Sequence, residues 1–354
     1  MLSHKKYTKR KNSRNNKKTK KRNNFKTKNR KYSQNTKSKT KTLIGGAGQY
    51  PHQFTGYTYE NTLGTTGSGG ASDTHFRVPV AVAVSAADNR IYVADSMNNR
   101  VQVFDGTTRN YIATLGTTGS KGASNTQFNG PTSVAVSAAD NRIYVADSGN
   151  HRVQVFDSTT RNYIATLGTT GSAGVSDTQF NGPSGVAVSA ADNRIYVVDQ
   201  GNHRVQVFDG PISNYGLIAT LGTTGSPGAS NTQFNSPWGV AVSAADNRIY
   251  VVDTGNHRVQ VFDGTRNYEF IATLGTPGSA GRDNTEFNGP TGVAISADGI
   301  HIYVADFSNN RVQVFVKTEL PQYTIFNNTR NGPPEYSLNP QQRLRSESPP
   351  PEYQ

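Results

Sequence analysis

A chain of 354 residues with 37 Lys and Arg against 24 Asp and Glu carries a formal net charge of +13, but this charge is unevenly distributed. Residues 1–42 hold 18 of the basic side chains and no acidic ones, so the other 312 residues carry 19 basic and 24 acidic side chains, a net charge of −5. The absence of cysteine excludes disulfides and thiolate metal sites, and no run of about eighteen apolar residues is present to cross a membrane.

Residues 1–48 are predicted to be a disordered basic tail and hinge, because their few apolar side chains cannot offset the entropy of ordering. The tail lacks the features of a secretory signal or transit peptide, so an intracellular location, cytoplasmic or nuclear, is expected. Its Lys/Asn composition is similar to that of some large DNA-virus proteins, a hint of a virus-encoded chain. Nuclear import or salt-sensitive, non-specific contact with nucleic acid or another polyanion is one role, and a solubilising tail is the equal alternative. The basic run suited to such contact is Lys17, Lys18, Lys20, Lys21 and Arg22.

The body of the chain, residues 55–316, repeats one unit. Residues 79–130 and 131–182 are identical at 44 of 52 positions, and the Arg of an Asn-x-Arg step returns at spacings of 52, 52, 54 and 53 residues. Each unit holds four short runs rich in Val, Ile, Tyr and Phe, separated by Asn, Asp, Gly and Ser, which predicts four antiparallel strands joined by tight turns. This period with four strands predicts a single all-β propeller made of four-stranded blades.

The number of blades follows from counting strands. Tyr57–Gly64 matches the fourth strand of the next unit without its first three strands, whereas residues 292–316 supply three strands and no fourth. Five blades result if this N-terminal strand pairs with the C-terminal third strand, which closes the ring and hides two sheet edges. A six-bladed ring, with another sheet built from residues 44–56 and 317–330, is the alternative.

The segment Pro183–Asp209, PSGVAVSAADNRIYVVDQGNHRVQVFD, its counterparts in the other units and the glycine-rich loop ending in QFNGP resemble the NHL-repeat family of β-propellers. Members more often have six blades and an Asp-Gly turn, which occurs here only as Asp298 and Gly299. The resemblance implies a protein scaffold, an RNA binder or, in some relatives and look-alikes, a lyase or hydrolase with a metal in the central channel. Fold alone does not choose among these functions.

The near-identity of the blades argues against the enzymatic function, because catalysis needs several different groups around one reacting atom. The sequence favours a non-enzymatic, monomeric binding ring with no catalytic residue, metal or cofactor. A multivalent lectin-like or small-ligand-binding propeller is the main alternative, and a metal-dependent enzyme is the second. His151, His203 and His257 occupy equivalent turns on sheets that stand roughly 10 Å apart, so they cannot share a metal and are expected to be exposed turn residues.

An Asp in each unit precedes an Arg by five residues across the turn between the second and third strands. This spacing predicts a charge-assisted hydrogen bond that clamps the turn, in preference to a cation site. Tyr92, Phe104, Phe128 and their counterparts are expected to fill the spaces between blades. The five predicted clamps are Asp95 with Arg100, Asp147 with Arg152, Asp199 with Arg204, Asp253 with Arg258, and Asp306 with Arg311.

Residues 317–354 are rich in Pro, Gln, Asn and Ser and are predicted to be a disordered tail. Two copies of PPxY within it resemble the ligand motif of WW domains, in which prolines preset an extended left-handed helix and the tyrosine fills an adjacent pocket. The chain is therefore expected to be a scaffold whose propeller binds a protein and whose tail docks WW-domain proteins such as ubiquitin ligases; chance duplication in a Pro-rich tail is the alternative. The motif residues are Pro333, Pro334 and Tyr336, then Pro350, Pro351 and Tyr353.

Overall fold

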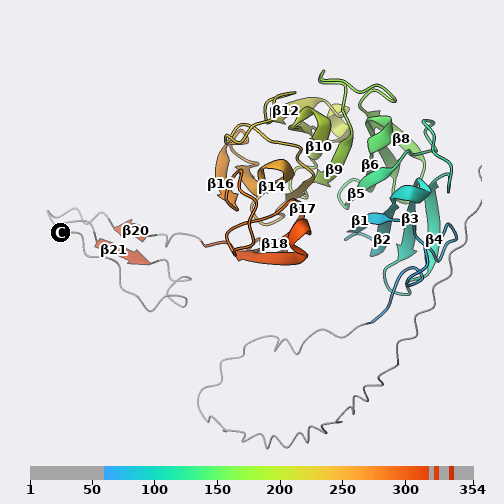
Figure 1. Ribbon diagram of the computed structural model, residues 1–354, viewed down its shortest axis with the longest axis horizontal. Helices are drawn as coiled ribbons and strands as arrows, with labels where there is room; N and C mark the ends of the chain where they lie inside the picture. Colours follow the sequence, from blue (N-terminus) through green and yellow to red (C-terminus); the bar gives the residue numbers. More distant parts are fainter. Residues whose placement is uncertain (1–59, 319–322, 327–334, 339–354) are drawn as a thin grey trace, which may run out of the picture. The chain divides into compact units, whose positions relative to one another are not determined.

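The computed structural model describes residues 60–318, 323–326 and 335–338. Within these ranges every regular element is a strand or a three-residue 3-10 helix. Five sheets follow one another around a common centre, coloured from blue to orange along the chain (Figure 1). The predicted all-β fold, a propeller of five blades, is confirmed.

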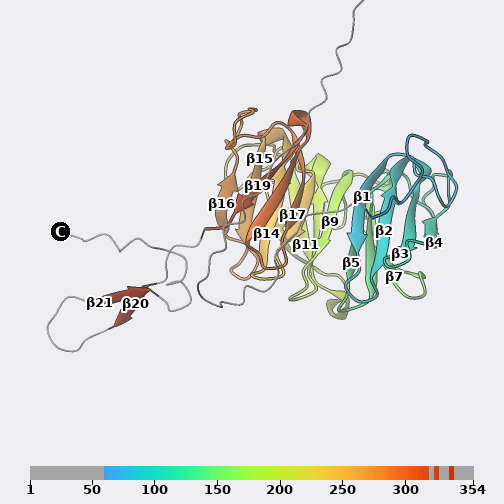
Figure 2. The same cartoon turned by 90° about the horizontal axis from the view of Figure 1, so that it is seen from below.

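Each of the first four blades is a four-stranded antiparallel sheet whose strands lie in chain order. In a view turned by 90°, the sheets lie side by side (Figure 2). Blade 1 contains β1 (Pro79–Val84), β2 (Arg90–Asp95), β3 (Arg100–Asp105) and β4 (Tyr111–Gly116). Blade 2 contains β5 (Pro131–Ser137), β6 (Arg142–Asp147), β7 (Arg152–Asp157) and β8 (Tyr163–Leu167). Blade 3 contains β9 (Pro183–Val188), β10 (Ile195–Asp199), β11 (Arg204–Phe208) and β12 (Leu217–Leu221). Blade 4 contains β13 (Gly239–Val242), β14 (Arg248–Asp253), β15 (Arg258–Asp263) and β16 (Phe270–Leu274).

The fifth blade has three strands among the described residues: β17 (Pro290–Ile295), β18 (His301–Asp306) and β19 (Arg311–Val316). The closing strand predicted at Tyr57–Gly64 is not formed within the described part of that segment, since residues 60–64 belong to no strand. The chain that follows them is held on blade 1 instead, where Phe76 packs edge-to-face on Phe104 with ring centroids 5.8 Å apart. Among the described strands, β19 is therefore the edge of the blade 5 sheet.

A 3-10 helix joins the second and third strands of every blade, and each of these helices ends at an Asn or a His with positive φ. Asn and His are several-fold enriched among non-glycine residues in the left-handed region, which explains their exchange at this position. These helices are η1 (Ser96–Asn98), η2 (Ser148–Asn150), η3 (Gln200–Asn202), η5 (Thr254–Asn256) and η6 (Phe307–Asn309), whereas η4 (Pro211–Ser213) lies between β11 and β12. The terminating residues are Asn99, His151, His203, His257 and Asn310.

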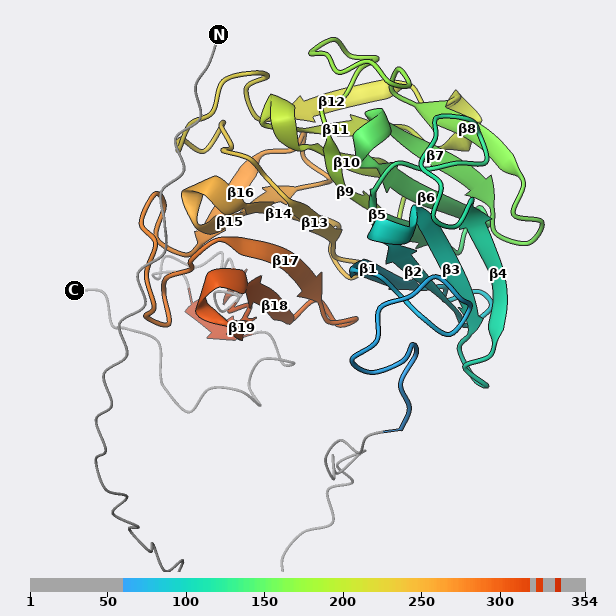
Figure 3. The same ribbon diagram turned by 45° about the vertical axis from the view of Figure 1, so that its right-hand side comes forward.

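Consecutive blades lie next to one another around the ring (Figure 3). The hydrophobic core lies between the blades and not within any one of them. Four clusters of buried side chains occur, one at each junction between consecutive blades: 1 and 2, 2 and 3, 3 and 4, and 4 and 5. In the first cluster, Tyr92 and Val101 of blade 1 meet Ile143 and Phe156 of blade 2, and Phe128 stacks edge-to-face on Phe156. The predicted filling of the spaces between blades by aromatic residues is thereby confirmed.

A glycine lies at or directly after the end of the fourth strand of each complete blade, where the chain turns against its neighbours. Gly168, for example, has φ +93°, and an added Cβ would lie 2.6 Å from the Phe180 ring and 2.8 Å from the His151 carbonyl oxygen. Both the backbone angle and the close approach demand glycine. This turn sends the chain into the loop that reaches the next blade.

Residues 323–338 contain a separate two-stranded antiparallel sheet, β20 (Tyr323–Phe326) and β21 (Glu335–Leu338), with Ile325 opposite Tyr336. This hairpin corrects the prediction of a disordered tail over these residues, and Tyr-Thr-Ile-Phe is a run of residues with high strand propensity. β20 pairs only with β21 among the described strands, so it builds no sixth blade, and residues 44–56 lie outside the described residues.

Candidate functional site

The repeated Asp and Arg side chains are buried and joined by short hydrogen bonds. In blade 2, the Arg152 Nε donates to Asp147 Oδ2 at 2.8 Å, and both side chains are at most 1% exposed. The Asn129 backbone N–H donates to Asp147 Oδ1 at 2.7 Å, and the Asn150 amide donates to Oδ2 at 2.8 Å. The carboxylate is thus surrounded by donors and has no open coordination position toward solvent.

The guanidinium of Arg152 holds the loop that arrives from blade 1. Its Nη1 donates to the Ala123 carbonyl at 2.8 Å, and its Nη2 donates to the carbonyls of Ser124 and Gln127, both at 2.9 Å. The guanidinium has five N–H donors in a fixed planar arrangement, which suits this set of carbonyl and carboxylate oxygens. Each clamp therefore fastens a turn of one blade to the loop that connects it to the preceding blade.

Equivalent ion pairs occur in all five blades, at 2.7 or 2.8 Å between Arg Nε and the Asp oxygen. The fifth differs in exposure, because Arg311 is 27% exposed whereas its four counterparts are 1% exposed. The structure thus brings together every pair that the spacing predicted. The pairs are Asp95 with Arg100, Asp147 with Arg152, Asp199 with Arg204, Asp253 with Arg258, and Asp306 with Arg311.

Burial and hydrogen bonding act in opposite directions on these carboxyls. Burial raises the pKa of Asp147 and Asp253, and this effect exceeds the lowering by their donors. Burial also tends to raise the pKa of Asp306, but this carboxyl is less enclosed, and the donors Asn288, Asn309 and Arg311 lower its pKa below the usual value. The pKa of Asp306 is therefore shifted in the opposite direction from the pKa values of Asp147 and Asp253, because the surroundings in blade 5 are more open.

The three histidines are half-buried structural acceptors, which corrects the prediction of exposed turn residues. The Gly182 N–H donates to His151 Nδ1, and the Gly289 N–H donates to His257 Nδ1, both at 3.0 Å; His203 accepts in the same way from the next repeat. In blade 1 the same role falls to Asn99, whose Oδ1 accepts from the Gly130 N–H. The ring nitrogen and the amide oxygen replace each other because both present an acceptor at the same place.

A second set of contacts between blades was missed in the sequence. Arg194 lies 3.3 Å from Asp192, donates to the Gly264 carbonyl of blade 4, and sits over the Tyr268 ring at 5.8 Å. Arg90 of blade 1 similarly donates to the Ser158 carbonyl of blade 2. The sequence signal for these contacts is the recurring Asp-Asn-Arg in the turn between the first and second strands. It places an Asp and an Arg on either side of the turn Asn. Arg90 and Arg194 thus also join neighbouring blades.

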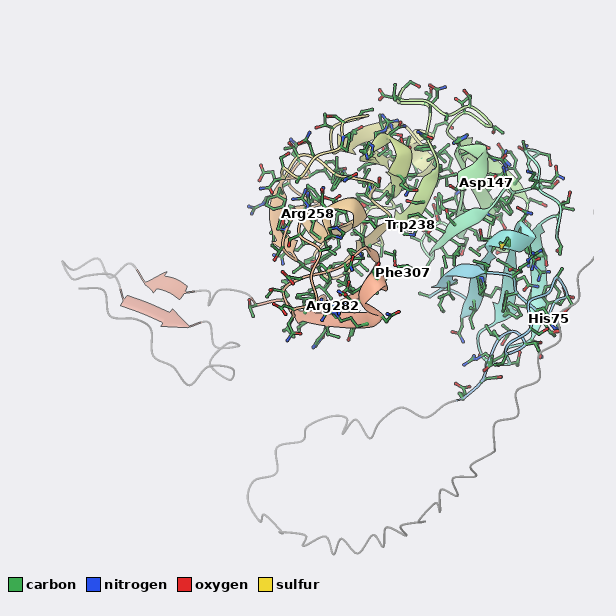
Figure 4. The ribbon with its side chains drawn as sticks, viewed as in Figure 1. His75, Asp147, Trp238, Arg258, Arg282 and Phe307 are labelled. Atoms are coloured by element: carbon green, nitrogen blue, oxygen red, sulfur yellow. The ribbon has the colours of Figure 1, made fainter. Side chains whose placement is uncertain are left out.

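The exposed side chains that break the repetition include Trp238, Arg282 and Phe307 (Figure 4). Trp238 precedes β13 where other units have Thr, Ser or Val, and Arg282 replaces Ala or Val. Arg282 lines a hollow of about 330 Å³ on blade 5 together with Ser308 and Asn309. These positions distinguish blades 4 and 5 from the others.

The remaining predicted site residues lie largely outside the described residues. Lys17 and its neighbours are not described, and of the two PPxY motifs only Glu335 and Tyr336 are placed, in β21. Among the described residues, no group of three or more His, Asp or Glu side chains is arranged to hold a metal ion. In the same part of the chain, no helix has the length and hydropathy needed to cross a membrane.

Five segments of the chain match the NHL repeat: residues 76–104, 128–156, 180–208, 234–262 and 287–315. Each match begins at the Phe that precedes a blade and ends at the Phe in its third strand. Each therefore contains one clamp and the 3-10 turn that it supports.

The chain is similar to proteins from a plant, a mammal and an insect. It is 29% identical over 203 residues to Protein SUPPRESSOR OF QUENCHING 1, chloroplastic, of Arabidopsis thaliana, covering 52% of this chain and 19% of that protein. The match to NHL repeat-containing protein 3 of Mus musculus is 28% identical over 253 residues and covers 66% and 64% of the two chains. The match to Protein brain tumor of Drosophila melanogaster is 34% identical over 143 residues and covers 40% and 12%. The chain thus spans less than two thirds of each relative's length.

Among solved structures, the fold is similar to a chain in the crystal structure of a nidogen/laminin complex. The TM-score is 0.50 at 15% sequence identity, covering 70% of this chain and 78% of that chain. At this identity the likeness shows the propeller fold alone.

Proposed function

Because the repeats of this chain belong to the NHL-repeat family, we propose that it is a non-enzymatic scaffold that attaches one macromolecule to another. One observation carries this proposal: in every blade the repeated Asp and Arg of the clamp are engaged with each other and are not available as separate sites. Arg152, for instance, makes its contacts with Asp147 and with carbonyl oxygens of the incoming loop. Such a ring offers a rigid surface, and its repeated groups hold the blades together.

The C-terminal tail supplies the attachment point whose chemistry is most specific. PPEY occurs at 333–336 and again at 350–353, and proline rings with a following tyrosine suit the aromatic groove of a WW domain. The spacer between the motifs has 13 residues (337–349), which corresponds to an average span of ~20 Å for a flexible chain. Two motifs at this separation favour a partner with tandem WW domains, since the second contact then forms within one complex.

The N-terminal tail supplies a second attachment of a different kind. Its 18 basic side chains without an acidic one attract a polyanion such as nucleic acid, with affinity that falls as salt rises. The propeller separates the two tails in sequence and offers Trp238, Arg282 and Phe307 as the non-repeated surface for a protein partner. The proposed role is therefore an adaptor with a polyanion-binding end and a WW-binding end.

Calorimetric titration of the full chain with a tandem WW protein tests this function. Wild type is compared with Tyr336→Ala, Tyr353→Ala and the double variant, and with Pro340→Ala as a tail substitution outside both motifs. We expect each single variant to weaken binding about 100-fold by removing the second contact, and the double variant to abolish it. Pro340→Ala should bind like wild type. Unchanged binding by the double variant would remove WW docking from the proposal.

A further inference from the structure

The first strands of neighbouring blades lie against one another, so they are the innermost strands of the ring (Figure 1). They begin on the face that carries the 3-10 helices between second and third strands. Trp238, directly before β13, shows this placement, because its N–H donates to the Val252 carbonyl near the point where β14 leads into η5. The Ser184 hydroxyl of blade 3 donates to the Trp238 carbonyl at 2.9 Å, and the Thr291 carbonyl oxygen of blade 5 lies 2.8 Å from the Cβ position of Gly239. Positions 184, 238 and 291 therefore lie on an inner rim of this face.

Trp238 is the single tryptophan of the chain, and it departs from the repeat on this rim. Its backbone carbonyl makes the contact with blade 3, whereas its side chain is 38% exposed and is not among the side chains of the clusters between blades. Smaller side chains serve at the same position in the other blades, so the packing of the ring does not require the indole. These counterparts are Val80, Thr132, Ser184 and Thr291.

Phe307 exposes a second aromatic ring beside the same rim. It is the first residue of η6, and its side chain is 70% exposed. β18 ends opposite Pro290, so Phe307, the following residue, lies next to the start of β17, and the residue after Trp238 approaches Thr291 at the same place. Figure 4 shows both aromatic side chains near the centre of the ring. The other blades carry polar residues at the position of Phe307, namely Ser96, Ser148, Gln200 and Thr254.

A polar hollow of about 330 Å³ lies next to Phe307, lined by the residues that follow it and by Arg282 of the incoming loop. The second arginine of the hollow, Arg311, is committed to the clamp with Asp306 and to three loop carbonyls. The guanidinium of Arg282, by contrast, is exposed and has no hydrogen-bond or ion-pair partner among the residues that the structure describes. Arg282 is therefore the cation of the hollow that is free to bind a ligand.

From these observations we infer that Trp238, Phe307 and Arg282 form one docking site for an extended segment of a partner protein. An apolar side chain of that segment lies against the two aromatic rings, and a carboxylate of the same segment pairs with Arg282 in the hollow. Aromatic residues and arginine are enriched at protein interfaces, and an Arg–carboxylate pair is a charge-assisted contact. The inference rests on the proposed scaffold function and specifies the chemistry of the partner that the propeller holds.

The charges around the hollow favour a single carboxylate over a polyanion. The loop that carries Arg282 also carries Asp283 and Glu286, where the loops entering blades 2 to 4 have Ser and Gln. A nucleic acid carries a phosphate at every nucleotide and would bring further negative charges close to these two acids, whereas one carboxylate can reach Arg282 alone. The local charge pattern therefore fits an acidic side chain of a peptide.

Peptide selection on the full chain tests this site. One library of short peptides carries a Leu or a Phe together with a Glu at varied spacing, and a matched library carries Gln in place of Glu. We expect the wild-type chain to select peptides from the Glu library and to bind them at least about tenfold more tightly than their Gln counterparts, which lack the charge-assisted hydrogen bond. Equal binding of the two sets, or no selection from either library, would overturn the inference.

Variants that install residues of the other blades assign the binding to this site. Arg282→Ala, which matches Ala123, should abolish the preference for Glu over Gln. Trp238→Ser combined with Phe307→Ser, which match Ser184 and Ser148, should abolish the selection of peptides. Lys121→Ala matches Ala173 and removes an exposed cation from the equivalent loop of another blade, so it should change neither result. The same loss in Lys121→Ala would contradict the assignment, and melting temperatures confirm that each variant is folded.

Each variant is also titrated with the tandem WW protein, which separates this site from the function of the tail. WW binding that persists without any selected peptide would reject the docking site and leave the adaptor role of the tail intact. Tight binding of a short oligothymidylate that is lost in Arg282→Ala would assign the site to single-stranded nucleic acid and overturn the peptide inference.

Discussion

At the scale of single residues, the most consequential feature is a buried charge pair that is fully hydrogen-bonded. Removing one partner of such a pair leaves the other charge without compensation in a low-dielectric interior, which costs about 3–5 kcal/mol. We predict that Arg152→Met lowers the free energy of unfolding by an amount in this range, measured by denaturant titration. Arg266→Met, at an ion pair of 3.9 Å whose Arg is 79% exposed, should change it by less than ~1 kcal/mol. Equal losses for the two variants would show that the clamp does not support the blade.

An acidic turn residue gives a prediction about pH. The Thr160 backbone N–H donates to Asp157, and this bond holds the pKa of the carboxyl below its usual value, with help from the Thr160 hydroxyl and the Thr159 N–H. A lowered native pKa means stabilisation that is complete above the usual Asp value of about 3.9 and is lost as the pH falls through the native pKa.

The melting temperature of wild type should therefore exceed that of Asp157→Asn at pH 6, and the gap should close as the pH approaches 2. A gap that stays constant over this range would show that the charge of Asp157 does not contribute.

The clamps could be predicted from sequence because they rest on a fixed spacing across one short turn. The histidine contacts could not, since the partner of His151 is the Gly182 N–H in the next repeat, and only the packing of two blades reveals it. The link from Arg194 to Gly264 was missed for the same reason. Contacts local to a turn follow from the sequence, whereas contacts across a junction depend on the angle between blades.

At the scale of elements, the hairpin of β20 and β21 affects the proposed WW contact. Tyr336 of the first PPxY motif is paired opposite Ile325 in this hairpin, whereas a WW ligand binds as an extended left-handed helix without sheet partners. Docking of the first motif therefore requires β21 to separate from β20.

Proline has no N–H to donate and disfavours the interior of a strand, so Ile325→Pro should release β21. In a Tyr353→Ala background, which leaves only the first motif, this variant should bind a single WW domain several-fold more tightly than its parent. Calorimetry of the two full-length chains measures the difference. Weaker or equal binding would mean that the hairpin does not restrain the motif.

The strands themselves were predictable in number and order, because each run of Val, Ile and Tyr is bounded by turn residues and repeats at nearly constant spacing. The hairpin was not, because Tyr323–Phe326 belongs to no repeat and its partner strand is only four residues long. The match between residues 57–64 and β4 predicted a closing strand. Its pairing, however, depends on contact between blades 1 and 5, which lie at opposite ends of the repeated region.

At the scale of the whole molecule, five near-identical units determine the blade count, and the junctions determine stability. Four junctions each contain a complete apolar cluster, and each cluster requires both of its blades. The overall architecture was therefore predictable from the repeats, whereas Trp238, Arg282 and Phe307 are single residues without a repeated pattern from which a role could be inferred.

We propose that one chain holds two different partners at the same time. Sedimentation velocity of the full chain with a tandem WW protein and a short DNA duplex, each carrying its own fluorophore, tests it directly at low salt. We expect one species containing all three components, with a WW affinity that changes less than twofold when DNA is added. Mutually exclusive binding of the two partners, or a chain that binds neither, would rule out the adaptor role.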